Sequence, residues 1–353
     1  MGTDLFGELI EEPTAGPMAK EFMHAPFSVL NAQAGAWQER KRAWIALGLR
    51  GDVTRSCRPS GGKNNRPIGE SGKGAYQGGD AWRGGTGTTS ALAGRQSGML
   101  KFSETCKDVG SLQCDSGTSL FDPVLAELLV SWFCPPAGSV LDPFAGGSVR
   151  GIVSAALGRR YLGIDIRAEQ VDANREQCGP LDLDGAAEWI VGDCLEAIPA
   201  LASDAIFDFV LSCPPYGDLE VYSELEGDIS SLDWPAFLDA YRAAIAATVG
   251  RLAPDRFAAF VVGDFRDRKT GLYRCFPSET ILAFQDAGAH LYNEAILVTP
   301  AGSLPIRCGA QFRVGRKLGK THQNVLVFVK GDGRRAADEC NRGLARSGRA
   351  RQC

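Results

Sequence analysis

The sequence lacks the features that define several classes of protein. Its 353 residues include only three histidines, and its eleven cysteines form no Cys-x-x-Cys pair, so neither a structural zinc site nor a disulfide framework is expected. No apolar run reaches the roughly 18 residues that a membrane-spanning helix needs. The opening stretch MGTDLFGELIEEP is acidic, unlike the basic-then-apolar layout of a signal peptide. These absences predict a cytoplasmic protein with reduced thiols and no metal.

The remaining composition is that of a globular enzyme, with 44% hydrophobic and 23% charged residues. The charge, however, is unevenly distributed. Residues 301–353 hold 12 Lys and Arg against 3 Asp and Glu, whereas the whole chain has a net charge of −4. This asymmetry indicates a basic face or tail that meets a polyanion. A tail that only aids solubility explains residues 334–351 equally well.

Changes in texture divide the chain into four segments. Residues 1–50 form an N-terminal extension with a helix expected over 34–49. Trp37, Trp44 and Leu47 recur there at helical spacing as an apolar face, and the two tryptophans are expected to dock the helix on the main domain. A nucleic-acid contact by Arg40 and its basic neighbours is the alternative. Residues 51–99 contain 13 glycines and almost no large aliphatic side chains. They predict a mobile, mildly basic loop that orders on DNA, or a plain linker. Residues 100–331 form the catalytic domain, and 332–353 a basic tail.

The main domain alternates apolar strands with helices. Strands are expected at 139–142, 161–165, 188–193, 208–212, 257–264, 292–300 and 324–331, and helices at 123–133, 148–157, 168–177, 234–252 and 277–287. Continuous apolar strands alternating with helices predict an α/β fold with a parallel sheet covered on both faces. No helix is expected between the last two strands, which should therefore pair antiparallel at one edge. The predicted architecture is a doubly wound, seven-stranded, mostly parallel sheet.

The stretch VLDPFAGGSVRGIV, residues 140–153, ends the first strand of this sheet in a glycine-rich turn. Doubly wound sheets bind ligands at this position. The spacing matches neither a dinucleotide fingerprint nor a phosphate loop. Asp165 ends the next strand, where a carboxylate accepts hydrogen bonds from a ribose diol, and Asp193 ends the third, within reach of an adenine amino group. Acidic strand ends around a glycine turn favour S-adenosylmethionine as cofactor over a pyrophosphate. Acidic helix caps in a generic α/β domain are the alternative.

The tripeptide Cys-Pro-Pro occurs twice, and its flanks distinguish the two copies. In SCPPY, residues 212–216, it follows the fourth strand and precedes a tyrosine. Two prolines remove two N–H donors and leave their carbonyls to accept hydrogen bonds, and the aromatic ring provides a stacking face. This combination suits direct methyl transfer to an exocyclic amine. In FCPPAG, residues 133–138, no aromatic follows, and a turn is expected.

Together, DPFAGG, the acidic end of the second strand and CPPY resemble the N4/N6 DNA amino-methyltransferases. PFSVLNAQAGAWQERKRAWIALG, TSLFDPVLAEL, CPPYGDLEVYS and RKLGKTHQNVLVFVKG resemble the phage and prophage branch, so the resemblance covers most of 26–331 and skips the glycine-rich loop. It implies a Rossmann-like methyltransferase fold, S-adenosylmethionine as cofactor, double-stranded DNA as partner, and a phage or restriction-modification setting. It also implies cofactor contacts by Thr118, Phe121, Pro123, Asp142, Phe144, Ala145, Gly146, Gly147, Asp165, Ile166, Asp193 and Cys194. The implied catalytic residues are Cys213, Pro214, Pro215 and Tyr216, with Tyr216 stacking on a flipped base.

One departure from the family pattern concerns Cys213. The first catalytic position is usually Asp, Asn or Ser, each a better hydrogen-bond acceptor than a thiol. The target is therefore either cytosine N4 or adenine N6. A C5-cytosine nucleophile is not favoured, because those enzymes use a Pro-Cys order. An RNA amino-methyltransferase and a DNA-binding module that has lost turnover are the two alternative functions.

Residues 302–323, between the last two strands, are basic and contain no acid. We expect phosphate contacts from Arg307, Arg313, Arg316, Lys317 and Lys320. A solvated hairpin is the alternative. The sequence leaves open whether the protein is a monomer or a homodimer.

Overall fold

The computed structural model describes residues 17–49, 121–181, 183, 185–217, 223, 225, 227–302 and 304–342. Thr118, the glycine-rich segment 51–99 and the tail beyond 342 lie outside the described residues. The strands are β1 (Val29–Asn31), β2 (Ser139–Asp142), β3 (Arg160–Asp165), β4 (Ala187–Val191), β5 (Phe207–Ser212), β6 (Leu252–Val262), β7 (His290–Val298) and β8 (His322–Lys330).

All eight strands form one sheet in the order β1-β7-β8-β6-β5-β2-β3-β4. Every neighbouring pair is parallel except those of β8, which runs antiparallel to both β6 and β7. The chain crosses from one half of the sheet to the other between β4 and β5, so the carboxyl ends of β2 and β5 lie side by side. This is the topological switch point at which doubly wound sheets bind ligands.

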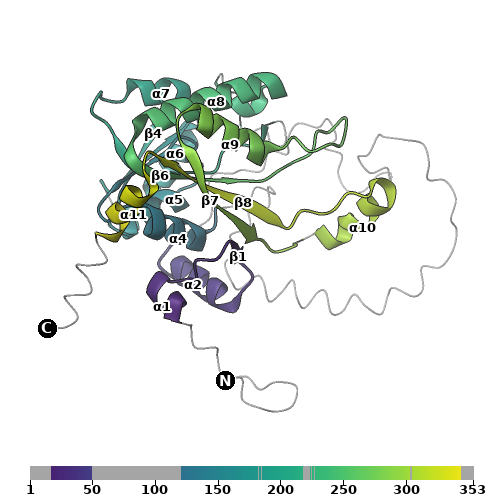
Figure 1. Ribbon diagram of the computed structural model, residues 1–353, viewed down its shortest axis with the longest axis horizontal. Coiled ribbons are helices and arrows are strands. Elements are labelled where there is room, and N and C mark those ends of the chain that lie inside the picture. The colour runs from purple at the N-terminus through teal and green to yellow at the C-terminus, as the bar shows by residue number, and fades with distance from the viewer. Residues whose placement is uncertain are drawn as a thin grey trace, which may run out of the picture. The chain divides into compact units, whose positions relative to one another are not determined.

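Helices cover both faces of the sheet (Figure 1). The described helices are α1 (Pro17–Phe22), α2 (Gly35–Ala46), α4 (Pro123–Phe133), α5 (Val149–Ala156), α6 (Ala168–Cys178), α7 (Cys194–Ala200), α8 (Trp234–Arg251), α9 (Phe276–Asp286), α10 (Leu304–Gly315) and α11 (Gly333–Asn341). Side chains of α4, α5 and α6 pack into one buried cluster, and those of α7, α8 and α9 pack into the other. None of the helices in the described ranges is both long and apolar enough to cross a membrane.

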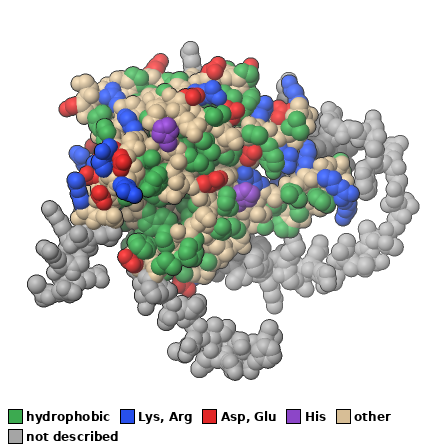
Figure 2. Space-filling model, in the orientation of Figure 1, with side chains coloured by type: hydrophobic (Ala, Val, Ile, Leu, Met, Phe, Trp, Pro, Cys, Tyr) green, Lys and Arg blue, Asp and Glu red, His purple; other side chains and the backbone are tan. Residues whose placement is uncertain are grey.

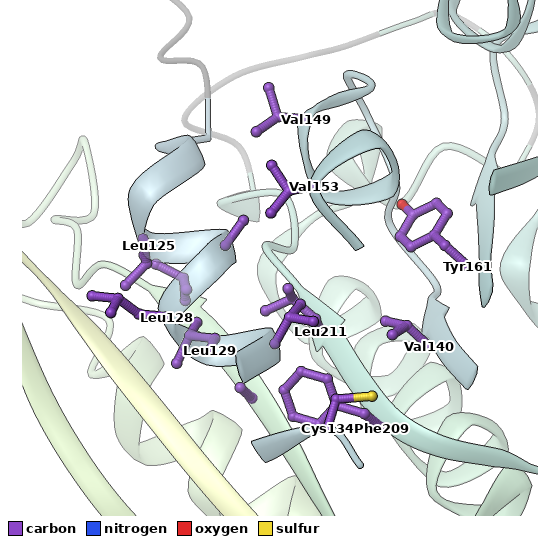
Figure 3. Close-up of a cluster of buried hydrophobic side chains, with 14 of the residues drawn as sticks. Leu125, Leu128, Leu129, Cys134, Val140, Val149, Val153, Tyr161, Phe209 and Leu211 are labelled. Carbon is purple, nitrogen blue, oxygen red and sulfur yellow. The ribbon is translucent and has the colours of Figure 1, made fainter. Parts of the chain in front are cut away.

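Local sequence sets where the main helices begin. Asp122 caps α4 by accepting hydrogen bonds from the backbone N–H groups of Val124 and Leu125, and Pro123 occupies the first turn. Asp233 and the proline that follows Trp234 start α8 in the same way. The leucines Leu125, Leu128 and Leu129 of α4 belong to the same buried cluster as Phe209 and Leu211 of β5 (Figure 3). Burial of such apolar side chains, at roughly 25 cal/mol per Å², holds the helix on the sheet that carries the site.

The N-terminal extension docks on α4 through α2 and adds β1 to the free edge of β7. Trp37 and Trp44 are buried, and their indole N–H groups donate to Asp122 and Glu127. Arg40 forms an ion pair with Glu127. The expected docking by the two tryptophans is confirmed. Leu47, by contrast, was wrongly assigned to the buried face: it is 64% exposed, because α2 ends at Ala46.

The doubly wound sheet and its antiparallel final pair are confirmed, with eight strands in place of the expected seven. The additional strand is β1, which has only three residues and pairs with a distant segment, so the sequence around it carries no alternating pattern. One expectation was wrong: α10 lies between β7 and β8, where no helix was predicted. The short helices α7 and α11 were also missed.

Candidate active site

The predicted cofactor and catalytic segments meet at the carboxyl edge of the sheet. Asp142 ends β2, Asp165 ends β3 and Ser212 ends β5. Strands β3 and β5 lie on either side of β2 and run parallel to it. The turn after β2 and the Cys-Pro-Pro-Tyr segment after β5 therefore leave the sheet side by side at the same edge.

Asp142 is the centre of a buried polar cluster that joins the two segments. Its side chain is fully buried. One carboxylate oxygen accepts hydrogen bonds from the Ser212 hydroxyl at 2.6 Å and from the backbone N–H of Phe144 at 3.1 Å. The other accepts from the guanidinium of Arg150 at 2.5 Å and from the hydroxyl of Tyr161 at 2.9 Å. Through these four hydrogen bonds, Asp142 fixes the glycine turn that follows β2 to the end of β5.

Arg150 holds the turn in shape as well as neutralising Asp142. Its second guanidinium nitrogen donates to the carbonyl oxygens of Phe144 and Ala145, both at 2.8 Å. Its charged group lies 4.7 Å from the centre of the Phe121 ring. Burial is the largest single effect on Arg150 and acts to lower its pKa, but the charge and hydrogen bond of Asp142 together with Tyr161 and Cys213 outweigh it, so the pKa is raised and the group is a permanent cation. The two predicted cofactor residues Phe144 and Ala145 are thus fixed by a residue that sequence reasoning missed.

The glycine turn leaves the backbone at Gly146 open to solvent. Gly146 has φ +50°, which favours glycine, and a Cβ there would meet no atom within 4 Å, so the backbone faces open space. Its N–H donates to Asp165 at 2.9 Å, and its carbonyl accepts from the side chain of Asn174 at 2.7 Å. Asn174 is buried and is held in turn by Gln170 of the same helix. This α6 support was also missed, because its amides do not stand out within the sequence of an ordinary polar helix.

Two further glycines let α5 and the turn lie close to the sheet. A Cβ at Gly151 would come within 2.4 Å of the Trp189 ring, and one at Gly163 within 2.8 Å of the Ala145 side chain. Contacts this short do not occur between real atoms, so a larger residue at either position would displace the turn. The two positions explain why small residues surround it.

Asp165 ends β3, as predicted, but Asp193 does not end its strand: β4 ends at Val191, and Asp193 is the N-cap residue of α7. The carboxylate of Asp165 accepts hydrogen bonds from the backbone N–H groups of Gly146 and Arg167. Ile166, the next residue in the chain, is half-buried. Each carboxylate oxygen can accept two hydrogen bonds, so these contacts are compatible with a ribose diol. Asp193 caps α7 through the N–H of Leu195 at 2.9 Å.

Cys194, the first residue of α7, is buried. Burial, with a smaller contribution from Asp193, raises the pKa of its thiol to about 12. The thiol therefore stays neutral at physiological pH and acts as a small apolar side chain rather than as a nucleophile.

The Cys-Pro-Pro-Tyr segment places its tyrosine in an aromatic cluster. The Tyr216 ring meets Phe265 and Phe276 edge to face, with centroids 6.2 and 6.1 Å apart. Its hydroxyl lies 4.0 Å from the sulfur of Cys213 and accepts a hydrogen bond from the side-chain amide of Gln323 at 2.9 Å. Pro214 is buried, and Pro215 and Tyr216 are partly exposed. Gln323, from the start of β8, is a further neighbour that sequence reasoning missed, because it is 107 residues away in the chain.

The second Cys-Pro-Pro copy is a turn, as predicted. Cys134 caps the end of α4 and is buried, and Gly138 donates to the carbonyl of Pro135 at 3.0 Å. Burial raises the pKa of the Cys134 thiol to about 12. This copy lies at the amino end of β2, away from the site.

A pocket of about 410 Å³ lies between the start of α9 and the start of β8. Its walls include Asp264, Pro277, Ser278, Lys320, His322 and Asn324. Lys320 is half-buried here, and this burial lowers the pKa of its ammonium group against the opposing effect of Asp264. Of the five predicted DNA-contacting residues, Lys320 is the one that lines this pocket.

The other basic residues belong to α10 and to the turn after it. This helix projects beyond the β7–β8 pair and buries none of its side chains (Figure 1). Arg313 is exposed, and Arg316 lies over the Phe312 ring at 5.2 Å. Blue and green side chains are mixed on this projection in Figure 2, and the exposed apolar ones include Ile306, Val314 and Leu318. No group of three or more His, Cys, Asp or Glu side chains able to hold a metal occurs in the described ranges.

The strand order, with β8 reversed inside an otherwise parallel sheet, is that of the Rossmann-like methyltransferase fold. A family model described as DNA methylase, for N6 and N4 methyltransferases, matches residues 119–176. The matched segment contains the glycine turn and Asp165 and ends before Cys213. This segment is thus similar to the corresponding part of the DNA methylases.

No curated protein matches the chain. Solved structures with a similar fold include TrmN from Thermus thermophilus, with 16% identity and a TM-score of 0.41 over 60% of this chain and 49% of that one. A TehB-like S-adenosylmethionine-dependent methyltransferase from Corynebacterium glutamicum has 16% identity and a TM-score of 0.37, covering 66% and 98% of the two chains. A proposed RNA methyltransferase from Pyrococcus horikoshii has 15% identity and a TM-score of 0.38, covering 60% and 81%. This chain therefore spans about half the length of TrmN.

Proposed function

We propose that the protein methylates an exocyclic amino group of a base in DNA, either cytosine N4 or adenine N6, with S-adenosylmethionine as donor. The observation that carries the proposal is the hydrogen bond between Ser212 and Asp142. It holds the glycine turn and the Cys-Pro-Pro-Tyr segment next to each other, so a donor on the turn and an amine at the segment face one another. The partial DNA methylase match supports the choice of DNA.

The residues of the turn fit the proposed cofactor. Gly146 offers open backbone, and Phe121 lies beside Arg150. In this proposal Asp165 accepts from the ribose diol and Asp193 from the adenine amino group, and Pro123 contacts the cofactor from the start of α4. When bound, S-adenosylmethionine supplies an electrophilic methyl group on a sulfonium. The role of the chain at this end is to bind and orient the donor, and Asp142 and Arg150 act by fixing the turn.

The catalytic segment positions the acceptor. A carbonyl oxygen of the proline pair accepts one of the two hydrogen bonds that the target amine can donate, and the Tyr216 ring stacks on the flipped base. The amine nitrogen then attacks in line, and its surplus proton passes to water. No covalent enzyme intermediate is needed, so Cys213 is not a nucleophile in this scheme.

The basic surface of α10 positions the duplex. Arg307, Arg313, Arg316, Lys317 and Lys320 contact phosphates, and because such contacts carry no sequence information they fix register alone. The phage or prophage origin implied by the sequence resemblance stays a prediction, as does the association with a restriction enzyme.

The experiment that tests this function compares labelled methyl transfer to duplex DNA and to tRNA by the purified protein. Transfer to DNA with label in N6-methyladenine or N4-methylcytosine is expected. Transfer to tRNA alone would make the protein an RNA methyltransferase. Cofactor binding by calorimetry without any methylated product would instead identify a DNA-binding module that has lost turnover.

A further inference from the structure

The weakest part of the proposed site is its first catalytic residue. An Asp, Asn or Ser there accepts a hydrogen bond from the target amine, whereas the thiol of Cys213 is a poor acceptor. The site needs that acceptor, because a hydrogen bond from the amine grows stronger as the nitrogen becomes cationic in the transition state. Another group of the chain must therefore replace it.

Gln323 lies where such a group is needed. It comes from the start of β8, far from the Cys-Pro-Pro-Tyr segment in the sequence, and it lies beside Tyr216 in the structure. Its amide nitrogen donates to the Tyr216 hydroxyl at 2.9 Å, and that same hydroxyl lies 4.0 Å from the Cys213 sulfur. The Tyr216 hydroxyl therefore contacts both Cys213, whose thiol is a poor acceptor, and Gln323, whose amide oxygen is a good one.

The orientation of the carboxamide is fixed at one end only. Because Nε2 donates to Tyr216, the carbonyl oxygen Oε1 is turned elsewhere, and within the described part of the chain it accepts no hydrogen bond. The side chain is only partly buried. A partly buried amide oxygen without a partner, held against the stacking residue of the site, is preorganised to receive an N–H donor.

The two flanking residues of β8 do not share this position. Side chains alternate across a strand, so His322 and Asn324 both line the neighbouring pocket, and Asn324 donates to Glu294 of β7 at 3.0 Å. Of the three residues, Gln323 is the one whose side chain bonds to the Tyr216 hydroxyl. Asn324 provides a matched control, an amide one residue away with a structural partner.

We propose that Gln323 is the catalytic residue that accepts the hydrogen bond from the target amine, in place of the side chain at position 213. This inference rests on the proposed function. As the amine nitrogen forms its bond to the methyl carbon, the carbon–sulfur bond breaks and sulfur keeps the electron pair. The nitrogen becomes cationic, and the N–H held by Oε1 is stabilised by the amide dipole. The surplus proton leaves to water, because a carboxamide does not take it up at neutral pH.

The test uses steady-state methylation of duplex DNA by the full chain, with single-turnover rates to isolate the chemical step. Gln323→Leu should lower kcat on the order of 100-fold with little change in KM, since the acceptor acts in the transition state. Gln323→Glu, which keeps an acceptor oxygen, should retain most of the rate, and Asn324→Leu should leave it near wild type. Thermal unfolding of each variant identifies any that fail to fold.

A rescue experiment separates this role from a structural one. Introducing Cys213→Asn into the Gln323→Leu variant restores an acceptor at the usual family position, and it should recover at least tenfold of the lost rate. Failure of the rescue in a folded double variant, or a Gln323→Leu variant as fast as wild type, would overturn the inference. Absence of DNA methylation by the wild-type protein would instead overturn the proposed function.

Discussion

The hydroxyl of Ser212 donates a 2.6 Å hydrogen bond to the buried carboxylate of Asp142, which joins the end of β5 to the end of β2. A hydrogen bond to a charged group contributes about 1.5–3 kcal/mol. We expect Ser212→Ala to lower the free energy of unfolding by about that amount and to weaken S-adenosylmethionine binding, because the turn loses a brace. Urea unfolding and calorimetry measure the two effects.

Ser148→Ala is the matched control for this substitution. Ser148 is also buried, but its hydroxyl bonds to the neutral amide of Gln177 at 3.0 Å. Its loss should cost about 0.5–1.5 kcal/mol. Equal costs for the two serines would show that the Asp142 bond has no special weight.

Removing the charge that compensates Asp142 should have a larger effect. Arg150→Met leaves a buried carboxylate without its cation, and breaking a buried ion pair in this way costs about 3–5 kcal/mol. The exposed pair of Arg175 and Asp172 offers a comparison, for which Arg175→Met should cost about 0–1 kcal/mol. Denaturant unfolding of both variants at pH 7 measures the difference. A cost for Arg150→Met below that of Arg175→Met would contradict the bracing role.

The fold could be predicted because its signals are local. Strands such as 139–142 are continuous apolar runs, and α4 begins with Asp122 and Pro123, a helix-start pattern that needs no tertiary information. The elements that were missed lack such signals. α10 buries no side chain, so it has no apolar stripe, and β1 forms only by pairing with β7.

The site could be predicted only as far as its motifs extend. The acidic strand ends and the two proline segments are visible in the sequence, but what each side chain contacts is not. The bonds from Arg150 to two carbonyls, from Asn174 to Gly146 and from Gln323 to Tyr216 depend on how separate elements pack. The partners of these motif residues therefore come from other elements of the fold and cannot be read from the motifs.

The basic projection of α10 should govern how binding depends on salt. If Arg313 contacts one phosphate, Arg313→Ala should weaken binding to all duplex sequences and reduce the slope of log K against log salt by about 0.9. Fluorescence anisotropy at several salt concentrations measures the slope. Arg160→Ala, at the first residue of β3 in the other half of the sheet, is the control and should leave it unchanged. A similar loss in both variants would indicate a diffuse charge effect rather than a site on α10.

The buried thiols should resist alkylation. Burial raises the pKa of Cys194 from an ordinary 9.0 to about 12, so at pH 8 it holds almost no thiolate. Peptide mass spectrometry after iodoacetamide treatment should show the exposed Cys275 labelled and Cys194 protected. The unfolded chain ionises this thiol near pH 9 while the folded one does not, so the free energy of unfolding should fall from pH 9 towards 12. Labelling of Cys194 as fast as Cys275 would refute its burial.

The chemistry itself is read most directly from the DNA of cells that express the protein. Nucleoside mass spectrometry of that DNA should detect N6-methyladenine or N4-methylcytosine with the wild-type chain and a strong reduction with Tyr216→Ala, which removes a stacking contribution of about 1–3 kcal/mol. Unmodified DNA from cells that contain folded wild-type protein, or equal methylation by Tyr216→Ala, would contradict the account.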